Sequence, residues 1–180
     1  IADVLGTAFR GVRRANLLPG NQVAVWGAGP IGFEAAAVAT FLGARVAVLD
    51  MNPYRMEMAE KFHKPEFVLD PTDQKTEETI MDWTNGQGLD VAFECVGNEK
   101  AAHQGMRLLK KRGTLAIIGV SHSLTVDPWD MIQRELSIYA SRNFNTHEFN
   151  EMIALVRNGL WADKVVTHRF PFREAEKAFE

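Results

Sequence analysis

Short apolar runs rich in β-branched residues alternate with amphipathic stretches along most of the chain. This alternation is typical of βαβ units and predicts a parallel sheet. Several runs, such as VAVW, are continuously apolar, which indicates strands covered by helices on both faces. The pattern therefore predicts an α/β fold, an open, doubly wound Rossmann sheet of six parallel strands. These strands are expected over Gln22–Trp26, Arg45–Leu49, Glu66–Leu69, Asp90–Cys95, Thr114–Val120 and Leu136–Ser141.

The amphipathic stretches between these strands indicate helices. In the first of them, Ile31, Ala35, Val38 and Leu42 recur at helical spacing. Gly43 follows where a left-handed C-terminal cap would lie. The same kind of spacing predicts helices over residues 31–42, 53–62, 72–83, 99–110 and 147–158.

Polar and glycine residues predict where two of these helices begin and end. Asn98 and Thr146 precede amphipathic runs, and we expect them to be N-caps, because a short polar side chain there can accept a hydrogen bond from a free backbone N–H. Gly113 and Gly159 follow the same runs and are expected to stop them. The fifth strand would then begin directly after Gly113.

The pattern changes at both ends of the chain. Residues 1–20 predict a leading helix, over Val4–Leu17, and a linker that turns into the first strand at Pro19-Gly20. Residues 21–159 are expected to form the Rossmann domain. Residues 160–180 predict a strand, a proline turn and the start of a helix that need not join the sheet. The first residue is Ile1 rather than Met, so we expect both ends to be cuts in a longer protein.

Composition and charge exclude several classes of protein. With 46% hydrophobic and 24% charged residues, the chain has the balance of a folded domain rather than of a disordered segment. The formal net charge of -3 gives no overall attraction to nucleic acid or to an anionic membrane. No apolar run approaches the roughly 20 residues of a membrane-spanning helix. Cys95 is the only cysteine, which excludes an internal disulfide and favours the reducing cytoplasm.

Residues 27–32, GAGPIG, match the pattern G-x-G-x-x-G directly after a predicted strand and at the start of a predicted helix. The first glycine allows a tight turn, the second lets the backbone approach a pyrophosphate, and the third lets the helix pack closely on the sheet. Free N–H groups and the positive end of the helix dipole would face the phosphates. The predicted dinucleotide-binding residues are Gly27, Gly29, Pro30, Ile31 and Gly32.

Asp50 ends the second predicted strand and is placed to accept hydrogen bonds from the adenosine ribose hydroxyls. A 2′-phosphate there would bring like charges within roughly 4 Å, so NAD is favoured over NADP. Residues 21–159 are therefore expected to form an NAD-binding Rossmann domain. Arg55, five residues later, softens that preference or belongs to a solvated helix face. A role of Asp50 as a surface cap is the alternative.

Two turns at the ends of later strands complete the candidate site. The turns over 95–98 and 119–122 should approach the nicotinamide half of the cofactor, because ligands of a doubly wound sheet bind beyond the carboxyl ends of its strands. The first turn contains Val96 and Gly97, and the second contains Val120. Cys95 fits a buried apolar role. The five histidines show no metal-like pairing, so they predict no metal site of their own.

Five segments, taken together, resemble one family along nearly the whole chain. They are ADVLGTAFRGVRRANLLPGNQVAVWGAGPIG, DVAFECVGN, GTLAIIGV, RELSIYASRNF and VVTHRFPFREAEKAFE. Their order and spacing resemble the medium-chain, zinc-dependent alcohol dehydrogenase superfamily, especially its sorbitol-, threonine- and sugar-acid-dehydrogenase-like branches. The resemblance implies that the chain is the cofactor-binding fragment of a longer enzyme. It also implies that residues 160–180 return into a GroES-like catalytic domain that lies outside this chain.

The resemblance extends to individual positions. Thr7, Val96 and Val120 match family residues near the nicotinamide, and Arg142 approximately matches an arginine near cofactor and substrate in the polyol branch. Asp3 matches a zinc-ligand position of some branches, but from the sequence it is equally an N-cap of the first helix. The remaining zinc ligands would lie in the catalytic domain.

The resemblance implies an NAD- and zinc-dependent oxidoreductase that oxidises a small secondary alcohol, such as a polyol, sugar acid or amino alcohol. The isolated chain would bind NAD without turnover. Two alternatives stay open, namely a zinc-free NADPH-dependent reductase of the same superfamily and an NAD-sensing module without chemistry. The family often forms homo-oligomers through the edge strand of this domain, here Leu136–Ser141. No nucleic-acid or membrane partner is expected.

Overall fold

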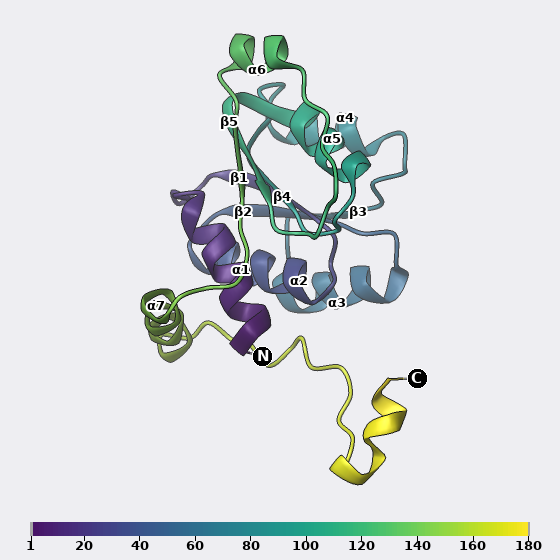
Figure 1. Ribbon diagram of the computed structural model, residues 1–180. Helices are drawn as coiled ribbons and strands as arrows, with labels where there is room; N and C mark the ends of the chain where they lie inside the picture. The colour runs from purple at the N-terminus through teal and green to yellow at the C-terminus, as the bar shows by residue number, and fades with distance from the viewer. Residues whose placement is uncertain (1, 180) are drawn as a thin grey trace.

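Six parallel strands form one sheet in the computed structural model, which describes residues 2–179 (Figure 1). The strand order is β3-β2-β1-β4-β5-β6. The predicted six-stranded, doubly wound α/β fold is confirmed. Because the order reverses between β1 and β4, a crevice opens beyond the carboxyl ends of these two strands. The strands are β1 (Gln22–Trp26), β2 (Arg45–Leu49), β3 (Phe67–Leu69), β4 (Leu89–Glu94), β5 (Leu109–Ile117) and β6 (Ser137–Ala140).

Helices cover both faces of the sheet (Figure 1). One hydrophobic cluster joins the sheet to α1, α2, α3 and α7, and a second joins the opposite face to α4 and α5. The buried stretch Ala35–Ala39 of α2 contains four alanines, whose small side chains let α2 pack closely against α1 and the sheet. The helices are α1 (Ala2–Arg14), α2 (Pro30–Phe41), α3 (Pro53–His63), α4 (Thr76–Trp83), α5 (Glu99–Leu108), α6 (Pro128–Arg134), α7 (Thr146–Arg157) and a 3₁₀ helix, η1 (Phe172–Ala178).

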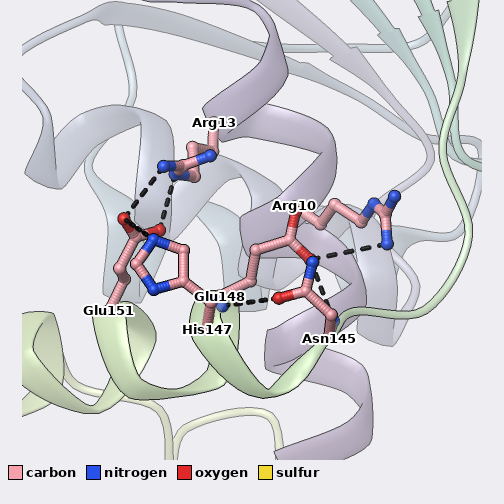
Figure 2. A network of polar contacts seen from close by, with 6 residues as sticks. All are labelled: Arg10, Arg13, Asn145, His147, Glu148 and Glu151. Atoms are coloured by element: carbon pink, nitrogen blue, oxygen red, sulfur yellow. Dashed lines mark hydrogen bonds and ion pairs between the residues drawn. The ribbon is translucent and has the colours of Figure 1, made fainter.

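A polar network fixes α7 beside α1 (Figure 2). The Asn145 side chain accepts a hydrogen bond from the Glu148 N–H, and the Glu148 carboxylate accepts one from the Asn145 N–H, each over 2.9 Å. Glu148 lies 3.4 Å from Arg10 of α1, and Arg13 donates to Glu151 over 2.9 Å. His147 faces the same Glu151 carboxylate. The helix cap and the contact with α1 therefore share one side chain, Glu148.

The predicted starts of the fourth and the last helix are wrong. The last helix is capped by Asn145 rather than Thr146, because Asn145 forms the reciprocal capping box described above. The fourth helix begins at Thr76 rather than Thr72, since the Asp70 side chain holds Thr72 in a turn by accepting from its N–H and hydroxyl. Asn98 caps α5 as predicted, accepting from the Ala101 N–H.

The junction of α5 and β5 also differs from the prediction. α5 ends at Leu108, and β5 begins at once at Leu109, so Gly113 lies inside a strand and does not stop a helix. The pairing with β4 shifts between Leu89 and Val91, and Arg112 adopts a positive φ of 64°. This irregularity lets a polar LKKRG segment continue the strand.

The segment after Gly159 forms no strand in the described residues up to Phe179. It runs as irregular chain into η1 and extends away from the sheet (Figure 1), so the predicted strand is wrong. Its aromatic residues Phe172 and Phe179 are almost fully exposed. Asp3 is not an N-cap either, because α1 already begins at Ala2 and Asp3 lies in its first turn. No helix within residues 2–179 has the length and apolar character needed to cross a bilayer.

Candidate functional site

The glycine-rich turn lies where β1 passes into α2, at the reversal point of the sheet. Gly27 has a φ of +91°, a left-handed conformation that favours glycine. A Cβ on Gly27 would come within 2.9 Å of a methyl carbon of Val96. Gly27 therefore lets the turn leave the strand against the neighbouring strand end.

The other two glycines meet very different surroundings. A Cβ on Gly32 would lie 1.7 Å from the Gly27 carbonyl oxygen, so any side chain there would break the turn. A Cβ on Gly29 would meet only an Arg55 nitrogen, at 3.8 Å. The space above Gly29 is thus open to a ligand, and Pro30 begins α2 next to it. This arrangement has the form of a pyrophosphate cradle at a helix N-terminus.

Asp50 directly follows β2, and its side chain is hydrogen-bonded to the glycine-rich turn. Its carboxylate accepts hydrogen bonds from the Ala28 N–H over 2.6 Å and from the Asn52 N–H over 2.8 Å. Only 8% of the residue is exposed, and Asn52 is the cap of α3, so Asp50 is not a surface cap. Each carboxylate oxygen keeps a lone pair for a further donor, such as a ribose hydroxyl.

Arg55 is the cation nearest to this carboxylate. Its guanidinium lies 3.8 Å from an Asp50 oxygen, and about half of its side chain is exposed. The same side chain lines both cavities that border Gly29. Arg55 therefore faces the two cavities rather than bulk solvent alone.

A cavity of about 900 Å³ opens beside these residues. This volume lies in the range of small-molecule and cofactor sites. Among the predicted residues, it is lined by Gly27, Gly29, Asp50, Arg55 and Val96. A smaller cavity of about 230 Å³, lined by Pro30 and by Lys164 of the C-terminal segment, adjoins it. The structure thus brings the glycine turn, Asp50 and Arg55 together.

The turns after β4 and β5 meet at their backbones. A Cβ on Gly97 would lie 2.6 Å from the Val120 carbonyl oxygen, so the two turns pack too closely for a side chain there. Val96 is half exposed and Val120 is 84% exposed, which leaves two apolar side chains uncovered at the crevice. Cys95 is partly buried, and burial raises the pKa of its thiol, so it fits a packing role.

Seven predicted positions do not line either cavity. Four of them, Ile31, Gly32, Gly97 and Val120, belong to the turns and the helix start beside the crevice, and the other three lie farther away in the chain. Thr7 is half-buried on α1, Arg142 is exposed after β6, and Asp3 is exposed on α1. Among residues 2–179, no three His, Cys, Asp or Glu side chains are grouped so that they could hold a metal ion.

Sequence reasoning missed one wall of the larger cavity. α5 presents to it a row of polar side chains, of which Gln104 receives a hydrogen bond from the Trp26 indole over 2.9 Å. The sequence signal that could have identified this polar row is its helical spacing, on the side of α5 opposite the buried Ala102 and Met106. The row consists of Lys100, His103, Gln104 and Arg107.

The strand order, the glycine turn and the acceptor at the end of β2 define a domain of the dinucleotide-binding, doubly wound class. Comparison with known proteins identifies its family. The model of the family described as "Zinc-binding dehydrogenase" matches residues 30–158, and the chain belongs to this family. The resemblance inferred from the sequence segments is confirmed.

Individual relatives agree with this assignment. The chain is 33% identical over 172 residues to L-galactonate-5-dehydrogenase of Escherichia coli strain K12, covering 94% of this chain and 50% of that protein. It is 32% identical over 184 residues to L-threonine 3-dehydrogenase of Chromobacterium violaceum, covering 99% of this chain and 53% of that protein. The chain therefore spans about half the length of these curated relatives.

Solved structures share the fold over nearly the whole chain. Alcohol dehydrogenase TADH from Thermus sp. ATN1 superimposes with a TM-score of 0.91 at 26% identity, over 98% of this chain and 53% of that one. A putative zinc-binding dehydrogenase from Sinorhizobium meliloti 1021, bound to NADP, has a TM-score of 0.81 at 25% identity, over 91% of this chain and 49% of that one.

Proposed function

We propose that this chain is the NAD-binding part of a zinc-dependent oxidoreductase that oxidises a secondary alcohol, of the polyol, sugar-acid or amino-alcohol class. The names of the relatives support the substrate class. The observation that carries the cofactor is the buried Asp50 carboxylate, held by the Ala28 N–H at the edge of an open glycine cradle.

The residues present fit a dinucleotide. NAD, when bound, supplies the acceptor for the hydride that leaves the alcohol carbon. The N-terminus of α2, with Ile31 and Gly32 in its first turn, binds the pyrophosphate above Gly29. Asp50 accepts hydrogen bonds from the adenosine ribose. Val96 and Val120 exclude water at the nicotinamide end, to which we also assign Gly97, Thr7 and Arg142.

The zinc ion of the proposed enzyme needs ligands from outside the described residues. Asp3 is an exposed carboxylate that belongs to no group of three possible metal ligands within residues 2–179. We therefore propose that most of the zinc ligands belong to a catalytic domain in the rest of a longer protein. We further propose that residues 1–20 and 160–180 connect to that domain, and that residues 21–159 are the NAD-binding unit.

A titration of NAD and of NADP, in the wild-type full-length protein and in Asp50→Ala, tests the cofactor. The wild type should prefer NAD, because a 2′-phosphate beside Asp50 brings like charges within roughly 4 Å. Asp50→Ala should lose this preference. Equal affinities of the wild type for the two cofactors would refute the proposal.

A second candidate is a zinc-free NADPH-dependent reductase of the same superfamily. Arg55, 3.8 Å from Asp50, favours it because a guanidinium can bind a 2′-phosphate, and one structural neighbour is bound to NADP. If Arg55 has this role, Arg55→Ala should weaken NADP binding more than NAD binding. A sensing module without chemistry is a third possibility, which alcohol oxidation by the full-length protein would exclude.

The proposed setting of the enzyme is the cytoplasm, which the single cysteine, Cys95, supports because it forms no disulfide within the chain. The proposed partner, besides the alcohol, is a second copy of the chain that pairs through β6. The formal net charge of -3 supports the absence of a nucleic-acid or membrane partner.

A further inference from the structure

Glu94 is a buried carboxylate at the end of β4, with 1% of its surface exposed. It lies opposite Trp26 of β1 and Ile117 of β5 in the sheet, positions that otherwise carry apolar residues. A charge in such a place is costly unless it is bound by strong hydrogen-bond donors. The contacts of Glu94 should therefore indicate what it is for.

Both donors that bind Glu94 come from the turn that follows it. One carboxylate oxygen accepts from the Val96 N–H over 2.8 Å and from the Gly97 N–H over 2.7 Å. These are short, charge-assisted hydrogen bonds, which hold a turn more firmly than bonds between neutral groups. Val96 lines the larger cavity, so Glu94 holds the backbone of a cavity-lining residue from the buried side of the turn.

The second oxygen of Glu94 faces the neighbouring turn. It is buried, has no hydrogen-bond partner within residues 2–179, and lies 2.8 Å from where a Cβ of Gly119 would stand. The Glu94 backbone carbonyl also accepts from the N–H groups of Ile118 and Gly119, over 2.8 and 2.9 Å. One residue therefore contacts both turns that form the nicotinamide side of the crevice.

We propose that Glu94 is a positioning residue that holds the turns after β4 and β5 in the shape that accepts the nicotinamide half of the cofactor. This inference rests on the proposed dinucleotide binding. Glu94 itself does not line the cavity, so it acts through Val96 and Gly97. The adenosine half depends instead on Asp50, at the other end of the crevice.

Titrations of the full-length protein with NAD and with AMP separate these two halves, because AMP carries only the adenosine end. Glu94→Ala leaves two N–H groups without their acceptor and should weaken NAD binding by about tenfold, while AMP affinity changes less than about twofold. Asp50→Ala is the matched comparison, and it should weaken both ligands. Glu94→Gln keeps an acceptor oxygen and should restore most of the NAD affinity.

Glu94→Asp keeps the experiment decisive if the alanine variant does not fold. Its carboxylate is one methylene shorter and cannot reach both N–H groups at their present distances, so it should also lose NAD affinity selectively. Parallel losses of NAD and AMP, or unchanged NAD affinity in both variants, would overturn the positioning role. A wild type that binds neither ligand would instead refute the proposed function.

Discussion

At the scale of single residues, a buried ionisable side chain makes the stability of the fold depend on pH. Glu34 of α2 is fully buried, and neither of its carboxylate oxygens has a hydrogen-bond partner within residues 2–179. Burial, reinforced by the nearby charge of Asp163, raises the pKa of this carboxyl from 4.5 to about 8. Between pH 4.5 and about 8, the folded chain therefore keeps a proton on Glu34 that the unfolded chain has released.

Replacing Glu34 by Gln should make stability less dependent on pH. The folded pKa lies above the unfolded one, so the stability present below pH 4.5 is lost as the pH rises towards 8. The loss is at most about 1.4 kcal/mol per pH unit, and Glu34→Gln should not show it. Urea denaturation across this pH range measures the difference, with the exposed Glu57→Gln as control. Parallel curves for wild type and Glu34→Gln would contradict the expectation.

His63 should produce the opposite dependence. Its ring is buried between Phe33, with centroids 4.1 Å apart, and Trp161, at 5.2 Å, and burial lowers the pKa of His63 from 6.5 to about 4. The folded pKa lies below the unfolded one, so stability present above pH 6.5 is lost as the pH falls towards 4. His63→Phe keeps an aromatic ring and should remove the part of this acid-induced loss of stability that His63 causes.

Thermal unfolding of wild type and His63→Phe between pH 4 and 6.5 measures this loss of stability. The midpoint of the wild type should fall faster with acid than that of the variant. The exposed His122→Gln is the control and should follow the wild type. If His63→Phe loses stability with acid as steeply as wild type, His63 does not titrate as described.

Among the elements, the contact between α7 and α1 combines hydrogen bonds of unequal strength (Figure 2). The capping box of Asn145 and Glu148 satisfies N–H groups that the helix leaves free, and Glu148 is buried. Arg13 and Glu151 form a partly exposed ion pair, which solvent screens. The exposed ion pair therefore contributes less than the capping box.

Two substitutions in this network should differ in effect. Asn145→Ala should lower the free energy of unfolding by about 1 kcal/mol. Arg13→Ala should lower it by about 0.5 kcal/mol or less. Urea denaturation of both variants under one condition compares them. A larger loss for Arg13→Ala would show that the ion pair, not the cap, holds α7.

The elements also show where sequence patterns succeed. β1, β2 and the start of α3 were predicted to the residue, because a continuous apolar run or a proline marks each boundary. The extension of β5 back to Leu109 was not predictable, since its LKKRG segment is polar and depends on an irregular pairing with Leu89. The short helix α6 was missed because no residue of it is buried.

For the whole molecule, the exposed edge of the sheet has the clearest consequence. β6 pairs only with β5 within residues 2–179, as the predicted edge strand should. The preceding α6 exposes two large apolar side chains, Trp129 at 68% and Ile132 at 66%. An unpaired strand edge and exposed apolar side chains both favour association with another chain.

We therefore expect the protein to form oligomers through β6 and α6. The double substitution Trp129→Lys and Ile132→Lys should shift the protein towards monomers, because a buried interface would then have to desolvate two charges. Light scattering of the full-length protein gives the mass. Leu18→Lys, exposed before β1, is the control and should leave the mass unchanged. A monomeric wild type would contradict the expectation.

The candidate site was predictable where its chemistry is local in sequence. The glycine turn and Asp50 follow from motif and spacing, and the structure brings them together. The helical spacing of α5 already indicates a polar face. Its place as a cavity wall, and the proposed role of Glu94, depend on which strand ends are neighbours, and the strand order of the folded sheet reveals this. Asp3 and Arg142, which line neither cavity, stay predictions.

The two hydrophobic clusters on opposite faces share only the sheet between them. We therefore expect the two faces to open independently. Protection of the backbone amides against hydrogen exchange should then be divided between two cooperative units. α4, a short helix with few buried residues, should exchange its amide hydrogens earlier than the enclosed strand β1. Cofactor binding at the carboxyl ends of the strands would then slow exchange on both faces at once, since the sheet belongs to each of them.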